Sequence, residues 1–244
     1  MNVFSARAVM DYTSKEIKLF KKLNTPQKIQ NFLGRLTINF EEKGETCYSP
    51  RIVIKERKAH CMEGAMLAAA ALEFHGRPPL VMDLRANDRD FDHVVAVFKQ
   101  FGCFGAISKT NHAVLRYREP IYRSVRELAL SFFHEYFDDK GKKNLREFSK
   151  PLDLRYFDPP SLKLPPSSRL RRTGRRTSNH PFFSKEEVGG SFDWRTSTKN
   201  LFQIPDYLDR IKHYPILSRR QIKSLRRADK IEITAGKLVE WKKS

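Results

Sequence analysis

Two residues in the first half of the chain could act together as a nucleophile and its base. Cys61 lies near the start of a run of strong helix formers, and His93 opens an apolar stretch further along. The unpaired N–H groups and the dipole at a helix start favour a thiolate over a thiol. A cysteine nucleophile also needs a base that takes its proton and a third group that orients this base. The sequence therefore predicts Cys61 as the nucleophile and His93 as its base.

The helix that carries Cys61 is predicted from residues 59–72, almost all of which are small or apolar. Charge is confined to Glu63, which complements the dipole in the first turn, and to Glu73 just past the end. A helix that is apolar all round is a buried helix. Gly64 removes a side chain where a neighbouring segment must approach. Gly76, with two prolines after it, ends the helix.

Three strands are predicted after this helix, at residues 80–84, 93–98 and 103–108. The last two are joined by a short turn, so they are expected to form a hairpin. If this turn is centred near Gln100 and Phe101, residue 98 faces residue 103 and His93 faces Ser108. A slip of one residue would turn the side chains to the other face. The predicted hairpin makes Ser108 a candidate partner of His93.

The remaining elements are predicted from capping residues and from the spacing of apolar side chains. Helices are expected at 14–23, from Thr25-Pro26 onward, at 49–57 and from Glu119 to about Phe137, and an irregular strand at 145–157. Beyond residue 199, helical pieces are expected at 205–213 and 218–229, and a strand at 231–241. Helices packed on a small antiparallel sheet make this an α+β fold.

The order of these features resembles the transglutaminase-like superfamily of papain-type cysteine enzymes. The resemblance covers about residues 57–110 and rests on Cys61 at the start of an alanine-rich helix, Gly76-Arg77-Pro78-Pro79 before a strand, Asp92-His93-Val94-Val95-Ala96-Val97, and a strand ending Gly105-Ala106-Ile107-Ser108. A wider block, from His60-Cys61-Met62-Glu63-Gly64-Ala65 to Asn111-His112 and Leu115-Arg116-Tyr117-Arg118, is similar to a little-characterised microbial branch of that superfamily. The resemblance implies a transglutaminase-like fold, with acyl transfer or amide hydrolysis at Cys61.

The chain departs from the superfamily pattern at the group that orients the histidine. The superfamily has an aspartate on the third strand, whereas Ser108 occupies the matching place here. A serine hydroxyl can accept a hydrogen bond from imidazole but carries no charge that would offset an imidazolium. Asn111 is an alternative orienting residue, and Asp83 is another if it faces the site. The tryptophan near the histidine is also absent, since Trp194 and Trp241 both lie beyond residue 185.

The same residues also have other interpretations. Cys61 is typical of a small buried core residue, and His93 of a strand end held by a backbone hydrogen bond. His60 is expected at the surface, with a substrate-side role as the alternative. A metal site would draw on His60, Cys61, His93, Cys103 and His112, but no pair has the close spacing of typical zinc ligands. The chain contains no Walker-type loop, Rossmann glycine fingerprint or G-x-S-x-G elbow, and no cofactor or metal is predicted.

The chain is strongly basic, with a formal net charge of +19 at pH 7. Such a charge favours an acidic partner, such as nucleic acid, an anionic membrane surface or an acidic protein. Part of it comes from arginines crowded among prolines and serines, a composition typical of a disordered linker. These are Arg169, Arg171, Arg172, Arg175 and Arg176. They are the candidate contacts to phosphate groups, and a solvated linker is the alternative.

We predict a transglutaminase-like domain at 1–158, a basic Pro/Ser/Arg-rich linker at 159–185 and a small basic α/β extension at 186–244. Three cysteines are too few and too oddly numbered for a disulfide framework, which favours a reducing compartment and a cytoplasmic location. No signal peptide and no membrane span are expected.

Two functions remain open from the sequence. The first is a cysteine-dependent enzyme that acts on a peptide or amide substrate through a thioester at Cys61, with Ser108 or Asn111 orienting His93. The alternative is a catalytically inactive scaffold of the same fold that binds nucleic acid or an acidic partner through its basic tail.

Overall fold

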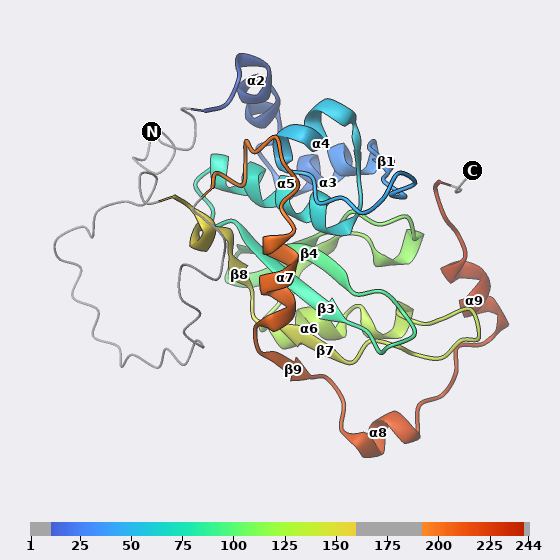
Figure 1. Cartoon of the computed structure of the whole chain (residues 1–244). Helices are drawn as coiled ribbons and strands as arrows, with labels where there is room; N and C mark the ends of the chain where they lie inside the picture. The colour runs from blue at the N-terminus through green and yellow to red at the C-terminus, as the bar shows by residue number, and fades with distance from the viewer. Residues whose placement is uncertain (1–10, 160–191, 242–244) are drawn as a thin grey trace, which may run out of the picture.

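The computed structural model describes residues 11–159 and 192–241. In these residues, α-helices pack on both faces of a seven-stranded antiparallel sheet (Figure 1). The α+β class predicted from the sequence is therefore confirmed. No helix in the described ranges combines the length and the apolar character that crossing a membrane requires.

The helices are α2 (Ser14–Lys22), α3 (Pro26–Gly34), α4 (Pro50–Glu56), α5 (Cys61–Phe74), α6 (Val125–Leu130), α7 (Gln203–Arg210), α8 (Arg219–Lys223) and α9 (Lys230–Gly236). The strands of the sheet are β3 (Leu80–Arg85), β4 (His93–Gln100), β5 (Cys103–Ile107), β6 (Arg118–Tyr122), β7 (Glu147–Ser149), β8 (Leu152–Asp153) and β9 (His213–Pro215). They run in the order β6-β5-β4-β3-β7-β9, with β8 also paired to β3. Two short strands, β1 (Thr37–Ile38) and β2 (Lys58–Ala59), pair separately.

The helix α5 lies at the centre of the larger core, between the other N-terminal helices and the sheet. Its residues from Met62 to Leu72 are all buried, as the absence of a polar face predicts. Alternate side chains of β4 serve the two faces of the sheet: Val94 and Ala96 pack toward α5, and Val95 packs toward α6. The sheet thereby fixes where β4 begins, and with it the position of His93.

Gly64 lets α5 approach the segment after β5. A Cβ atom at this position would lie 2.3 Å from the Cβ atom of Lys109, a distance that side chains do not tolerate. The prediction that Gly64 marks a close approach is confirmed. The approach brings the start of α5 next to the segment that carries Ser108.

The predicted N-terminal helix starts are confirmed by their caps. The hydroxyl of Thr13 accepts from the N–H of Glu16 in a capping box, and Thr25 and Ser49 each cap a helix that has proline at its first position. These caps come from short sequence motifs, which explains why the starts of α2, α3 and α4 could be predicted.

The predicted register of the β4–β5 hairpin is wrong by two residues. Gln100 faces Cys103 and Phe98 faces Gly105, so the turn consists of Phe101 and Gly102. Both turn residues have positive φ, 52° and 79°, which matches the twist of a two-residue hairpin. A shift of two residues leaves every side chain on the same face. His93 and Ser108 therefore remain neighbours, although they lie diagonally rather than opposite each other.

Several other predicted elements are wrong or only partly right. The helix expected from Glu119 begins as strand β6, and α6 starts only after the Ser124 cap. The return strand expected at 145–157 is divided into β7, β8 and a 3-10 turn. Most of the strand expected at 231–241 is the helix α9 (Lys230–Gly236), which begins with a capping box between Asp229 and Glu232, and Val239 beyond it forms a single β-bridge with His112. Of the helical piece expected at 218–229, the helix α8 covers Arg219–Lys223.

The C-terminal segment, residues 192–241, runs along the body of the molecule from α7 to α9 (Figure 1). It contributes β9 to the edge of the sheet, and Trp194 is fully buried in the same core as α5. The segment predicted as an extension thus shares its sheet and its core with residues 11–159. Most of the predicted linker, including the five arginines, lies outside the described residues.

Candidate active site

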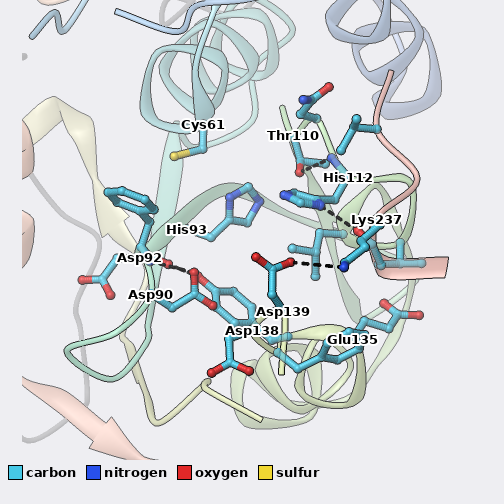
Figure 2. A pocket seen from close by; sticks show the side chains of 18 of the residues that line it. Cys61, Asp90, Asp92, His93, Thr110, His112, Glu135, Asp138, Asp139 and Lys237 are labelled. Carbon is cyan, nitrogen blue, oxygen red and sulfur yellow. Dashed lines mark hydrogen bonds and ion pairs between the residues drawn. The ribbon is translucent and has the colours of Figure 1, made fainter. Parts of the chain in front are cut away.

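Cys61 is the first residue of α5 and lines a cleft of about 660 Å³. The side chain is half-buried, and Figure 2 shows it at the end of the helix, above the ring of His93. The first helical hydrogen bond runs from the N–H of Gly64 to the carbonyl of His60. The N–H groups of Cys61 and Met62 precede this bond, as unpaired donors at a helix start do. The thiol therefore lies where a helix dipole stabilises negative charge.

The thiol of Cys61 is favoured in its ionised form. Burial alone would raise its pKa, but hydrogen bonds from His60 and His93, together with their positive charge, lower the pKa well below the ordinary value for cysteine. The cysteine thus has two imidazoles as neighbours, one on its own helix start and one on β4. A thiol with a lowered pKa beside an imidazole is the arrangement that a cysteine nucleophile requires.

His60 is not the surface residue that the sequence predicted. Its side chain is 22 % exposed, and its Nε2 lies 3.0 Å from the carbonyl oxygen of Thr46 and 3.4 Å from a carboxylate oxygen of Glu63. Burial would lower the pKa of His60, but the hydrogen bond to Cys61 and the charges of Cys61 and Glu63 raise it to about 9. His60 therefore favours a positive charge beside the thiol of Cys61.

Glu63 is a fully buried carboxylate that holds this side of the site together. It accepts hydrogen bonds from the N–H of His60 (2.9 Å), the N–H of Tyr48 (2.9 Å) and the hydroxyl of Thr46 (2.8 Å). A further bond comes from the amide of Asn39 at 3.1 Å. Several donors offset the cost of burying a carboxylate, and here the carboxylate faces His60. Glu63 thus does more than complement the helix dipole.

His93 is buried at the start of β4, and its Nε2 lies 2.7 Å from the hydroxyl oxygen of Ser108. Ser108 is itself held by Gln30 of α3. The side-chain carbonyl of Gln30 accepts from the N–H of Ser108, and its amide donates to the carbonyl of Ser108, both at 2.9 Å. The ring of His93 is therefore oriented by the hydroxyl of Ser108, and the backbone N–H and carbonyl of Ser108 are both held by Gln30.

The two alternative partners of His93 are engaged elsewhere. Asn111 forms two hydrogen bonds with the backbone of Trp241, at 2.7 and 2.8 Å, and so attaches the C-terminal segment. Asp83 accepts a hydrogen bond from Nε2 of His213 at 2.9 Å. Neither residue bonds to His93, so in the described structure Ser108 is the side chain that takes this place.

The wall of the cleft opposite Cys61 is rich in carboxylates, although the chain as a whole is basic. Figure 2 shows these acidic side chains around His93, namely Asp90, Asp92, Glu135, Asp138 and Asp139. Positive groups in the cleft include Lys237, which lies 4.0 Å from Asp139, and Lys109. Lys109 is buried, with its ammonium group donating to the carbonyl of Leu36, and burial lowers its pKa to about 8.

The other two cysteines have different surroundings. Cys47 is buried, and burial together with the charge of Glu63 raises the pKa of its thiol. Cys103 lies half-buried on β5. All three cysteines are free, and the set His60, Cys61, His93, Cys103 and His112 does not come within common ligand reach in the described ranges. Cys61 is therefore the thiol with the features of a nucleophile.

Two residues of the site were missed by the sequence-based prediction, His60 as a charged neighbour and Gln30 as a support. The spacing His60-x-x-Glu63 is that of a capping box and was the available signal for the first. Gln30 had no local signal, because its partner lies 78 residues away in the chain.

A scan against protein-family models finds no match to this chain, and a search of curated proteins finds none either.

Proposed function

We propose that the protein is a cysteine-dependent enzyme of transglutaminase-like fold that catalyses acyl transfer or amide hydrolysis, with Cys61 as nucleophile and His93 as base. One observation supports this function above all. The half-buried thiol of Cys61 lies at a helix start, its pKa is lowered by two imidazoles, and it faces a cleft large enough for a substrate side chain. A cysteine that only fills the core does not require a neighbouring imidazole, whereas Cys61 has two.

In the first step the Cys61 thiolate attacks the carbonyl carbon of a peptide or side-chain amide, and the carbonyl oxygen takes the negative charge. The N–H groups at the start of α5 stabilise this oxyanion. The protonated ring of His93 donates its proton to the amide nitrogen as the C–N bond breaks. An amine leaves, and the acyl group is bound to Cys61 as a thioester.

In the second step a water molecule or an amine attacks the thioester carbonyl, and His93 accepts the proton of the attacking group. The C–S bond breaks, which releases an acid or a new amide and regenerates the thiolate. Ser108 keeps the ring of His93 in place throughout, and His60 helps to hold the thiolate between turnovers. Because a thiolate is easily oxidised, we expect the enzyme in a reducing compartment such as the cytoplasm.

The proposed function is tested by the pH dependence of iodoacetamide labelling, measured peptide by peptide. The Cys61 peptide should label well below pH 8.5, the approximate pKa of an ordinary thiol, because its thiolate persists there. In His93→Ala the onset of labelling should move to higher pH, since one of the groups that lower the pKa is lost. Cys47 should label only on unfolding, because it is buried with a raised pKa.

The matched control is His112→Ala, which removes an exposed imidazole from the wall of the same cleft. Its Nδ1 lies 2.9 Å from the carbonyl oxygen of Gly236. The control should leave the labelling curve of Cys61 unchanged. If Cys61 labels like an ordinary thiol in the wild type, the enzyme proposal fails, and the inactive scaffold with a basic tail becomes the function to test.

A further inference from the structure

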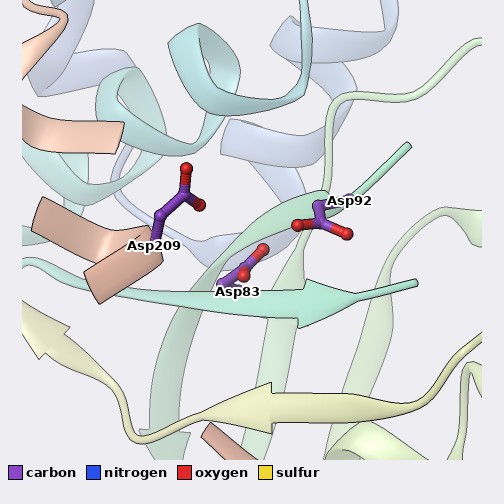
Figure 3. Close-up of side chains that lie close together, drawn as sticks. All are labelled: Asp83, Asp92 and Asp209. Carbon is purple, nitrogen blue, oxygen red and sulfur yellow. The ribbon is translucent and has the colours of Figure 1, made fainter. Parts of the chain in front are cut away.

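Three carboxylates that are far apart in the sequence meet beside β3, and one of them, Asp92, also lines the cleft of Cys61. Asp83 lies on β3, Asp92 directly precedes β4, and Asp209 is in the last turn of α7. One oxygen from each lies within 4.8 Å of the others (Figure 3). Asp92 and Asp209 are exposed, whereas Asp83 is 1 % exposed. The cluster therefore has one buried end and one end open to solvent.

The buried carboxylate lacks part of its expected bonding. Oδ2 of Asp83 accepts a hydrogen bond from His213, but Oδ1 is buried and has no hydrogen-bond partner in the described residues. A buried carboxylate oxygen without a partner is costly, because it has lost its water and gained nothing in exchange. This oxygen belongs to the buried member of the cluster, which Figure 3 shows on β3 between the other two, so a ligand bound among the three carboxylates would satisfy it.

The positive groups around the cluster do not balance its charge. Arg85 places its Nε 3.9 Å from Asp92 and its Nη1 3.5 Å from Glu147, and its Nη2 donates to the carbonyl of Asp209. Even with Arg85 and a charged His213 counted, the three clustered carboxylates and Glu147 leave an excess of negative charge. The remaining oxygens of the cluster are hard ligands that suit a cation of the calcium or magnesium type.

We propose that Asp83, Asp92 and Asp209 form a binding site for a divalent cation, and that the site takes Ca²⁺ in preference to Mg²⁺. Calcium binds oxygens at about 2.3–2.6 Å, so two ligands on opposite sides of it can lie about 5 Å apart. Magnesium binds at about 2.0–2.1 Å and spans only about 4 Å. The three oxygens lie within 4.8 Å of one another, so the larger ion can reach all of them. Water molecules complete the coordination at the exposed end.

The ion would join three parts of the fold through one charged centre. It bridges the central strand β3, the residue before His93, and the helix α7 of the C-terminal segment. Its effect is to hold the C-terminal segment on the sheet. This inference does not depend on the chemistry of Cys61, because none of the three ligands bonds to the thiol or to His93.

The test is a titration of the full-length, metal-free protein with CaCl₂, followed by calorimetry and by thermal unfolding. We expect one site with a Kd between roughly 10 μM and 1 mM and at least tenfold weaker binding of MgCl₂. At ten times Kd, the midpoint of unfolding should rise by roughly 3–6 °C. Neither readout involves enzymatic activity.

Asp209→Asn assigns the location, because this residue is exposed and its substitution leaves the core intact. The variant should bind Ca²⁺ at least about tenfold more weakly and lose most of the thermal shift. Asp206→Asn, an exposed aspartate earlier on the same helix, is the matched control and should bind like the wild type. Absence of binding at 10 mM CaCl₂, or equal binding by Asp209→Asn, would overturn the proposal.

Discussion

Ser108 can hold the ring of His93 in place, but it cannot supply the negative charge of an aspartate. In this site a carboxylate acts from the other side, because buried Glu63 faces His60 and His60 neighbours the thiol of Cys61. Glu63 thus stabilises a positive charge on His60, the residue directly before the nucleophile. Ser108 therefore orients the base, whereas Glu63 stabilises the charge.

Ser108→Ala should slow the labelling of Cys61 at pH 7 by about 2- to 10-fold. The variant loses a single neutral hydrogen bond, which is worth about 0.5–1.5 kcal/mol, whereas loss of an orienting aspartate typically costs far more. The measurement is the second-order rate of iodoacetamide labelling. Thr110→Ala is the control, because it removes a hydroxyl from the same cleft that bonds to His112 and not to His93. Unchanged labelling of Ser108→Ala would show that the hydroxyl does not orient the base.

The central pair of the candidate site and its hydroxyl partner could be named from the sequence, because each follows from a local pattern. Cys61 stands at a helix start, His93 at a strand start and Ser108 at the end of the hairpin. Asn111 was also named, but its true partner is the backbone of Trp241, a contact across 130 residues. Gln30 was missed for the same reason. Contacts between distant segments leave no local pattern.

At the scale of elements, the close packing of α5 against the segment after β5 defines the shape of the site. Gly64 is what permits it, since any Cβ atom there meets the Cβ atom of Lys109. Lys109 directly follows Ser108, so a displacement of this segment also displaces the partner of His93. The packing of one helix turn is therefore linked to the geometry of the base.

Gly64→Ala should lower the free energy of unfolding by about 1–3 kcal/mol, the usual cost of overpacking a core. The measurement is urea unfolding followed by circular dichroism. Gly34→Ala is the matched control, because a Cβ atom at the end of α3 meets nothing within 4 Å. The control should be neutral or stabilising by up to about 1 kcal/mol. Equal stability of Gly64→Ala and wild type would mean that Lys109 moves aside without cost.

The starts of α2, α3 and α4 could be predicted because each has a short capping motif. Other elements were predicted wrongly, either because such a motif was overlooked or because pairing with another strand decides the structure. The hairpin register was placed two residues off, because a bulky residue such as Phe101 rarely has the positive φ that its turn requires. The helix α9 was taken for a strand, although Asp229 and Glu232 have the spacing of a capping box. Strand β6 is decided by pairing with β5, which no local pattern contains.

For the whole molecule, Arg195 is a buried electrostatic link between the C-terminal segment and residues 11–159. It is 3 % exposed and bonds to Glu73 at 2.5 and 2.7 Å and to Asp158 at 2.8 Å. Trp194 beside it donates to the same Asp158 at 3.1 Å. Burial raises the pKa of Glu73, and Arg195 acts against this rise.

Arg195→Ala should lower the free energy of unfolding by about 3–5 kcal/mol, because Glu73 and Asp158 would remain buried without their cation. The measurement is again urea unfolding. The control is Arg226→Ala, which breaks an ion pair with Glu232 on a side chain that is 66 % exposed and should cost at most about 1 kcal/mol. A loss of similar size in both variants would contradict a buried link.

The position of Trp194 and α9 in the fold also sets an order of events during synthesis. Cys61, His93 and Ser108 leave the ribosome long before Trp194, which completes the core, and before Lys237, which lines the cleft. At about 5–20 residues per second, the roughly 130 residues between Ser108 and the end of α9 take on the order of 10 seconds. During that interval the nascent thiol has neither its finished cleft nor its finished core, and both are completed only once the segment from Trp194 to Lys237 has been made.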